Sequence, residues 1–154
     1  MPTFEGQLSA CAGRFAIVAA RFNVEVVAKL VAGAKEGLTK HGVAEDHTDL
    51  VWVPGSFEIP LVAQRLAASK KYAAVICLGA VIRGDTDHYD YVCQAAATGI
   101  AQVSLDTGVP VIFGVLTCAS EQQALDRAGG NEGNKGYAAA VTGITMANLL
   151  KQLP

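Results

Sequence analysis

The chain has 154 residues, of which 51% are hydrophobic and 17% are charged, and its formal net charge is −2. This length suits a single domain over residues 1–154, and the composition excludes a disordered chain, a disulfide scaffold and the basic surface that nucleic-acid binding needs. Because the charged fraction is below the roughly 25% typical of soluble domains, we expect other copies of the chain to cover part of the surface.

Apolar stretches of strand length alternate with helical patterns along the chain. In chain order, the sequence predicts strands over residues 14–20, 49–54, 72–79 and 109–116. The helical patterns cover residues 25–41, 59–69, 89–107, 121–127 and 136–150. Nearly all-apolar strands are buried on both faces, which predicts an α/β fold: a four-stranded parallel sheet with helices on both faces, doubly wound in the flavodoxin manner. The weakly alternating segment 3–8 can pair as an edge strand.

Three residues carry signals for helix starts and ends. Asn23 precedes the first predicted helix, where an Asn side chain can cap a free backbone N–H. Gly42 follows that helix, at the place where a left-handed residue commonly ends a helix. Ser120 precedes the fourth predicted helix and supplies a start signal there.

The segments that follow the four strands carry most of the unusual residues. Because the carboxyl ends of parallel strands lie at one edge of a sheet, these segments converge. They are residues 21–23, 54–58, 81–88 and 117–120. Phe22 in the first segment can stack on a planar ring or cover the core. Ser56 and Glu58 in the second offer polar groups that suit a pyrimidine edge or a polyol chain.

Residues 84–88 combine a glycine, two aspartates, a threonine and a histidine at the start of a predicted helix. The backbone N–H groups of a helix start and the Thr86 hydroxyl can bind an anion. A plain turn capped by Thr86 or Asp87 explains the same residues. His88 can donate and accept protons near neutral pH, or it can serve as a packing or capping residue.

A glycine-rich break follows the fourth predicted helix. Four glycines fall between Arg127 and Gly136, and Arg127 and Lys135 bracket the break. The break is either a kink with solvated charges or a place where Arg127 binds an anion through two parallel hydrogen bonds. Within one copy of the chain Arg127 need not reach the converging segments, so an anion-binding role there requires a neighbouring copy.

Cysteine spacing and the N-terminal residues predict a cytoplasmic protein. Cys11, Cys77, Cys93 and Cys118 form no CxxC pair, which favours buried, reduced thiols over a metal or redox site. Residues 1–15 lack the basic and apolar regions of a secretory signal. The apolar runs are far shorter than the ~20 residues of a membrane span, so we expect no contact with a membrane.

Five segments, in this order and spacing, resemble the lumazine synthase family. They are ARFN at 20–23, WVPGSFEIP at 52–60, VIRGDTDH at 81–88, FGVLT at 113–117, and RAG with GNKG at 127–129 and 133–136. The resemblance spans nearly the whole chain and implies a flavodoxin-like three-layer sandwich. It also implies a cofactor-free condensation of 5-amino-6-(D-ribitylamino)uracil with 3,4-dihydroxy-2-butanone 4-phosphate. The product is 6,7-dimethyl-8-ribityllumazine, formed in the penultimate step of riboflavin biosynthesis with release of phosphate and water.

The resemblance also implies a role for each site residue. His88 would be the catalytic residue that shuttles protons. The pyrimidine and its ribityl chain would be held by Phe22, Ser56, Phe57, Glu58, Ala80, Val81, Ile82 and Phe113. The phosphate would be held by Asp85, Thr86 and Arg127. Phe113 and Arg127 would come from the adjacent subunit, and neither a metal nor a cofactor is expected.

Assembly in this family is by pentamers, some of which close into an icosahedral shell. The break at 128–136 carries no insertion, so we expect a shell of about 60 subunits, with the N-terminal strand pairing with a neighbouring subunit and riboflavin synthase as a candidate enclosed partner. Two alternatives are a catalytically idle flavin- or lumazine-binding shell protein and a flavodoxin-like electron carrier. The presence of both His88 and Arg127 favours the enzyme, and the short segment 21–23 lacks the Ser/Thr-rich cradle of an electron carrier.

Overall fold

The protein is an α/β sandwich around a parallel sheet, seen here in a computed structural model that describes residues 1–9 and 13–154. Four parallel strands form the sheet in the order β2-β1-β3-β4: β1 (Arg14–Ala20), β2 (Thr48–Val53), β3 (Tyr72–Ile82) and β4 (Val111–Cys118). The helices are α1 (Val24–Lys40), α2 (Ile59–Ala68), α3 (His88–Thr107), α4 (Glu121–Asp126) and α5 (Lys135–Leu150). Two short 3-10 turns, η1 (Glu45–His47) and η2 (Ser56–Glu58), precede β2 and α2. A small antiparallel pair, β5 (Ala128–Gly130) and β6 (Gly133–Asn134), joins α4 to α5.

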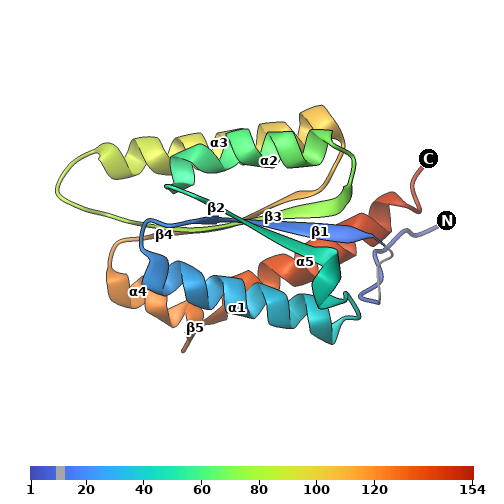
Figure 1. The fold of residues 1–154 in the computed structure, drawn as a ribbon, viewed down its shortest axis with the longest axis horizontal. Helices are drawn as coiled ribbons and strands as arrows, with labels where there is room; N and C mark the ends of the chain where they lie inside the picture. The colour runs from blue at the N-terminus through green and yellow to red at the C-terminus, as the bar shows by residue number, and fades with distance from the viewer. Residues whose placement is uncertain (10–12) are drawn as a thin grey trace.

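The helices cover both faces of the sheet, as predicted. Figure 1 shows α2 and α3 on one face and α1, α4 and α5 on the other. Successive residues of β1 point alternately to the two faces: Phe15 and Ile17 pack into the cluster under α1 and α5, whereas Ala16 and Val18 pack under α2 and α3. This two-sided burial is why β1 consists almost entirely of apolar residues. Although α3 runs for 20 residues, no helix in the described part of the chain could cross a membrane.

All four predicted strands and all five predicted helices are present, and the largest boundary shift falls on β3. This strand continues to Ile82, three residues past its predicted end, because β4 pairs with it that far, through Ala80–Leu116, Val81–Thr117 and Ile82–Cys118. The strand β4 accordingly ends at Cys118, so residues 117 and 118 belong to a strand and not to the following loop. β3 therefore extends beyond its other neighbour, β1, which ends at Ala20.

Two of the three predicted helix signals are confirmed. Gly42 has a positive φ of 88° after α1, and the Ser120 hydroxyl accepts a hydrogen bond from the Gln123 N–H at 3.2 Å at the start of α4. The prediction that the Asn23 side chain caps α1 is wrong. Asn23 does precede the helix, but its side-chain amide donates to the carbonyl oxygen of Ala80 at 2.8 Å.

Residues 3–8 form no strand within this chain, so they do not pair with its sheet as an edge strand. They run beside α5 and the turn that follows it, where two side-chain amides bond their backbone: Asn148 of α5 donates to Gln7 O at 2.8 Å, and Gln152, just past the helix, donates to Glu5 O at 2.7 Å. Among the described residues, β2 and β4 therefore remain the edge strands. Pairing of the N-terminal segment with a neighbouring subunit stays a prediction.

Candidate active site

A cavity of about 740 Å³ lies at the carboxyl ends of β1, β2 and β3, between η2 and the start of α3. Its lining consists of Phe22, Pro54, Gly55, Ser56, Phe57, Glu58, Ala80, Val81, Ile82, Gly84, Thr86, His88, Tyr89 and Val92. Every residue that we predicted from the first three strand ends is among them except Asp85. The convergence predicted from a parallel sheet is thus confirmed for this set.

The cavity forms because β3 extends further than its neighbour β1. After Ala20 the chain turns towards β2, where the Arg21 N–H donates to Val53 O at 2.8 Å and the Phe22 N–H donates to Pro54 O at 3.0 Å. On that side the last residues of β3 are left without a neighbouring strand. The backbone of Ala80–Ile82 therefore borders the cavity.

Two phenyl rings stand at the cavity with much of their surface exposed. Phe22 is 71% exposed and Phe57 is 60% exposed. Each phenylalanine lies in a short connecting segment just after a strand, and this position places its ring outside the core. Exposed aromatic rings beside a cavity are suited to stack on a flat, conjugated ligand.

Ser56 is the one buried polar residue among those described, with 5% of its surface exposed. It opens η2 and lies over Gly79 of β3, whose missing side chain leaves room for the Ser56 hydroxyl. The polar set at this end of the cavity is completed by Glu58, the last residue of η2.

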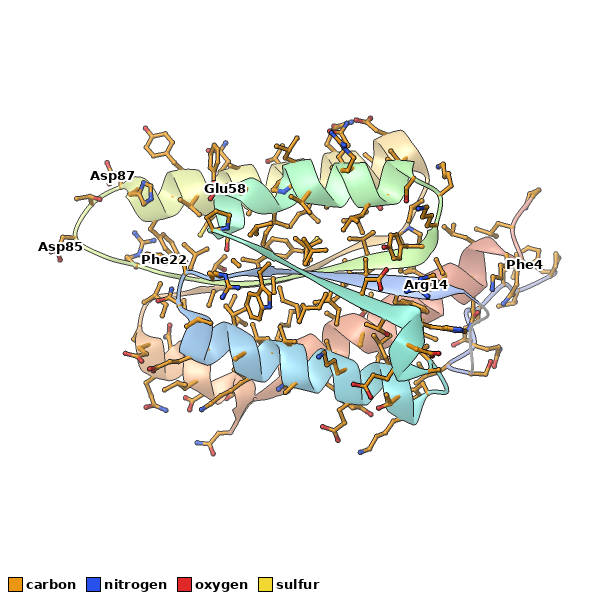
Figure 2. All side chains as sticks on the ribbon, in the orientation of Figure 1. Phe4, Arg14, Phe22, Glu58, Asp85 and Asp87 are labelled. Carbon is orange, nitrogen blue, oxygen red and sulfur yellow. The ribbon has the colours of Figure 1, made fainter. Side chains whose placement is uncertain are left out.

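The loop between β3 and α3 places its polar residues on two sides. Thr86 and His88 line the cavity, and the Thr86 hydroxyl accepts a hydrogen bond from the His88 N–H at 3.4 Å. Figure 2 shows Asp85 and Asp87 at the outside of the loop, away from the sheet. The cavity side of the loop is therefore formed by the Thr86 hydroxyl and the backbone, and not by the two carboxylates. Asp87 precedes α3 but makes no side-chain cap.

Arg83 of the same loop is occupied elsewhere. Its guanidinium lies over the ring of Tyr89, 4.3 Å from the ring centre, and one of its nitrogens lies 3.5 Å from an Asp90 carboxylate oxygen. The backbone N–H of Arg83 donates to Cys118 O at 2.9 Å, which ties the loop to the end of β4. Arg83 does not line the cavity. Neither Lys nor Arg occurs among its described lining residues, so an anion bound there meets no cation from the same chain.

A second hollow, a groove of about 450 Å³, lies on the other face of the sheet. It is lined by Phe113, Val115, Leu116, Thr117, Cys118, Arg127, Glu132, Asn134, Lys135 and Ala138, from β4, the β5–β6 hairpin and α5. The structure therefore brings Phe113 and Arg127 together, but not with the cavity residues. One chain holds two separate sets of predicted site residues.

The hairpin explains how two cations meet in the groove. Arg127 and Lys135 are joined by a backbone hydrogen bond from the Lys135 N–H to Arg127 O at 2.8 Å. The Arg127 guanidinium donates to Gln123 O at 3.0 Å, and no carboxylate in the described residues forms an ion pair with it. Sequence reasoning did not assign a role to Lys135, although its position opposite Arg127 around the glycines was a usable signal. Tyr89 and Val92 of the cavity lining were also missed.

The cysteines near the two hollows are ordinary thiols. Burial raises the pKa of Cys93 and of Cys118 above the usual thiol value, and it also raises that of Cys77. All three are unpaired and carry protons at neutral pH; Cys11 lies outside the described residues. In residues 1–9 and 13–154 no three His, Cys, Asp or Glu side chains gather as a metal would require.

The sequence model of the 6,7-dimethyl-8-ribityllumazine synthase family matches residues 12–151 of the chain. The match covers almost its full length, and the strand order and helix layers fit the flavodoxin-like fold expected of this family. The chain belongs to this family. It is an enzyme of riboflavin biosynthesis, which forms the lumazine from the ribitylaminouracil and the butanone phosphate.

Proposed function

We propose that the condensation takes place where the cavity of one copy of the chain meets the groove of a neighbouring copy. One observation carries this proposal: the described residues that line the cavity include aromatic rings and a histidine but no Lys or Arg, whereas the groove on the opposite face offers Arg127, Lys135 and a partly exposed Phe113. The butanone substrate is an anion and the uracil is a flat ring, so the complete reaction needs both sets. Placing the two hollows against each other supplies both.

The cavity holds the pyrimidine and its ribityl chain. Phe22 stacks on the ring, and Phe113 of the neighbouring copy closes the site from the other side. The polar groups of Ser56 and Glu58, together with the backbone of Ala80–Ile82, bind the ring edge and the hydroxyl groups of the chain. Phe57 flanks the ribityl chain. The exposure of Phe22 and Phe57 in the isolated chain supports these roles.

The phosphate lies at the loop between β3 and α3, where the Thr86 hydroxyl and the backbone N–H groups at Asp85 and Thr86 donate to it. Arg127 of the neighbouring copy contributes a guanidinium that can bind two phosphate oxygens at once. Lys135, held beside Arg127 by the hairpin, adds a second positive charge. The outward direction of Asp85 and Asp87 removes repulsion that would otherwise oppose phosphate binding.

The chemistry follows from the functional groups of the two substrates. The 5-amino group of the uracil attacks the ketone carbon of the butanone and water leaves, which forms an imine. Loss of the proton from the neighbouring carbon expels phosphate from the terminal carbon and leaves an enol, which becomes a ketone by proton transfer. The ribityl-bearing nitrogen then attacks this ketone, and loss of a second water closes the new ring.

His88 serves as the proton shuttle in these steps. It begins α3, lines the cavity and lies two residues after the phosphate-binding Thr86, so it is near the carbon from which a proton must leave. An imidazole can take that proton and return one to the departing oxygen. Holding the two reactants in register contributes several kcal/mol of rate acceleration by itself, on the order of the intramolecular effects known for such reactions.

The same contact between cavity and groove defines the assembly. Because the two surfaces differ, each copy uses its cavity towards one neighbour and its groove towards the other, which generates a ring when the rotation between copies closes. We place five copies in the ring and expect the rings to build the icosahedral shell, in the cytoplasm. Sedimentation velocity on the purified protein checks this; a pentamer with no larger species contradicts the shell.

A mixing experiment tests the proposed site. His88→Ala damages only the cavity and Arg127→Ala damages only the groove. When both variants are co-expressed and assemble at random, about a quarter of the interfaces combine an intact cavity with an intact groove. We expect lumazine formation to return to roughly that fraction of the wild-type rate, followed by the absorbance of the product.

The matched control pairs two lesions in the same hollow. Co-expression of His88→Ala with Phe22→Ala leaves every cavity damaged, so no activity returns beyond that of the separate variants. If the pair with lesions in different hollows also fails to recover, although both variants assemble, the site does not lie between copies. Wild-type turnover well above the uncatalysed rate is the reference for all of these measurements and separates the enzyme from an idle binding shell.

A further inference from the structure

A gap in the hydrogen-bond ladder lies at the point where β1 ends. The paired residues of β1 and β3 run up to Ala19 and Leu78. Continuing this register would place residue 21 opposite Ala80, but by then the chain has turned away towards β2. The backbone of Ala80 on that side would therefore lack the partner that a neighbouring strand normally supplies.

The side chain of Asn23 fills this gap. Its amide nitrogen donates to the Ala80 carbonyl oxygen at 2.8 Å, across 57 positions of sequence. In a strand the backbone groups of alternate residues point to the same edge, so the N–H and C=O of Ile82 point to the side that β1 has left. Asn23 thus ends the β1–β3 ladder and leaves the backbone of Ile82 facing the cavity.

Two local features show that Asn23 serves the cavity and not the helix. Asn23 adopts a left-handed conformation with φ 60° and ψ 43° in place of the extended conformation usual for the residue that precedes a helix, and Asn tolerates this conformation better than other non-glycine residues do. Its side chain also does not cap α1, although Asn commonly provides such a cap. Only the backbone carbonyl of Asn23 bonds the helix, accepting from the N–H groups of Val26 and Val27. Residues that break local rules in this way concentrate at functional sites.

Asn23 connects the two parts of the cavity that would contact the pyrimidine, namely Phe22 and the backbone of Ala80–Ile82. It directly follows Phe22, whose backbone N–H donates to Pro54 O and whose side chain is exposed. The backbone bonds of Arg21 and Phe22 tie this turn to the end of β2, whereas the Asn23 amide ties it to β3. The Asn23 amide therefore helps to set the distance between the Phe22 turn and the backbone edge at Ala80–Ile82.

We propose that Asn23 is a positioning residue for the condensation: by donating to Ala80 O in place of a missing strand, it holds Phe22 and the backbone of Ala80–Ile82 in register for the pyrimidine. This inference rests on the proposed function, which places the pyrimidine between these two groups. It predicts an effect on one substrate and not on the other, since no hydrogen bond among the described residues joins Asn23 to the phosphate loop or to the groove.

The test uses two replacements that separate the amide from the backbone conformation. Asn23→Gly keeps the left-handed conformation accessible and removes the amide, and Asn23→Asp keeps the shape but offers no N–H donor. Lys70→Gly is the matched control, because Lys70 is the other described non-glycine residue with positive φ and lies far from the cavity. Binding of 5-amino-6-(D-ribitylamino)uracil is titrated calorimetrically, KM is measured for each substrate, and assembly is checked by sedimentation.

We expect Asn23→Gly and Asn23→Asp to raise the Kd and KM for the uracil about tenfold, the effect of losing one well-formed hydrogen bond. The KM for the butanone phosphate should change less than about twofold, and the sedimentation profile should stay as in the wild type and Lys70→Gly. Equal increases in both KM values, or a loss of assembly without a change in uracil binding, overturn the proposal. If Phe22→Ala weakens uracil binding and Asn23→Gly does not, only the role of Asn23 is rejected; if neither does, the proposed site itself is wrong.

Discussion

The cavity and the groove are built in different ways, and the difference explains how one small chain handles two dissimilar substrates. The cavity is formed by loops at three strand ends, where exposed phenyl rings and backbone groups meet a histidine. The groove is formed by packed elements, β4 and α5, with a hairpin that brings Arg127 and Lys135 together. In the proposed site, ring recognition and proton transfer thus belong to loops, while the positive charge lies beside packed elements.

The separation also has an electrostatic consequence. A cation placed in the cavity would be next to Glu58 and would pair with its carboxylate in the absence of substrate. On the opposite face of the sheet, the Arg127 guanidinium is left without a carboxylate partner among the described residues. In the proposed assembly, this guanidinium reaches the phosphate bound at the cavity of a neighbouring copy. Residue replacements that damage the cavity and leave the groove intact, or the reverse, test this division of roles most directly.

The largest expected effect is a loss of stability where α5, which supports the groove, packs against α1. A side chain at Gly136, at the start of α5, would collide with the backbone of Leu30 in α1, which cannot move aside as a side chain can. We expect Gly136→Ala to lower the free energy of unfolding by about 3 kcal/mol or more and to displace the hairpin with Arg127 and Lys135. Urea denaturation measures the change.

Gly143, on the same helix, is the matched control. An added methyl group there would meet Ile76, Ala74 and Ile112 at ordinary contact distances of 3.5–3.6 Å. Gly143→Ala should be neutral or should stabilise by about 0.5–1 kcal/mol through its better helix propensity. Equal destabilisation by both replacements would show that the close approach of α1 and α5 is not what supports the groove.

Arg127→Ala has the next largest expected effect. Removing the guanidinium takes away charge-assisted bonds to phosphate worth about 2–3 kcal/mol, which is roughly 30- to 150-fold in KM for the butanone phosphate. The KM for the uracil should change little, because Phe22 and the backbone of β3 remain. Steady-state kinetics with each substrate varied in turn measures the two constants; equal changes in both would argue against a phosphate-binding role.

His88→Ala tests the cavity in the complementary way. We expect kcat to fall about 10- to 100-fold, the loss of one general acid–base group while the positioning of the substrates is kept. Assembly and both KM values should stay close to those of the wild type. An unchanged kcat rejects His88 as the proton shuttle, and single-turnover rates separate a slower chemical step from slower product release.

Most of the fold could be predicted because its signals are local. A central strand such as β1 is apolar on both faces since it packs against helices on both sides. Ser120 and Gly42 mark the ends of their helices through bonds and conformations that involve only near neighbours. The cap assigned to Asn23 failed for the opposite reason: its amide bonds Ala80, and nothing near Asn23 in the sequence reveals a carbonyl group left unpaired on another strand.

The site residues also divide into those that the topology predicts and those that depend on the detailed path of the chain. The cavity residues follow the ends of parallel strands, and topology alone brings Phe22, Ser56 and Thr86 together. Lys135 was missed because glycine spacing suggested a kink, whereas the chain forms a hairpin whose backbone bond places Lys135 beside Arg127. The outward direction of Asp85 likewise depends on the path of the loop, which the sequence leaves undetermined.

Gly79→Ala is expected to have a moderate effect confined to the cavity. The added methyl group would collide with the Ser56 hydroxyl and force that side chain away from β3. We expect a loss of about 1–2 kcal/mol in the free energy of unfolding and weaker uracil binding. In the Ser56→Ala background the hydroxyl is absent, so the same replacement should change stability by less than about 0.5 kcal/mol. A double-mutant cycle measures the coupling, and additive effects would contradict direct contact.

The smallest expected effect lies far from both hollows, at the amino end of the sheet. There the Tyr72 hydroxyl donates to one Asp49 carboxylate oxygen at 2.6 Å, and Arg14 contacts the other at 2.7 Å. The hydrogen bond from Tyr72 is the main cause that lowers the pKa of Asp49, with a further contribution from Arg14. The same bond raises the pKa of Tyr72.

Tyr72→Phe should therefore lower the free energy of unfolding by about 1 kcal/mol or less at pH 7, because the pair is partly exposed to solvent. The stabilisation from the lowered pKa of Asp49 is present above the unfolded-state value, about 3.9, and is lost as the pH falls through the folded-state value. The stabilisation from the raised pKa of Tyr72 is present below about 10 and is lost as the pH rises through the folded-state value. Urea denaturation from pH 2 to pH 11 should show the difference between wild type and variant at its largest between these limits. Both KM values should be unchanged, since neither the cavity nor the groove contacts Tyr72; a changed KM would mean that the two hollows are coupled to the far end of the sheet.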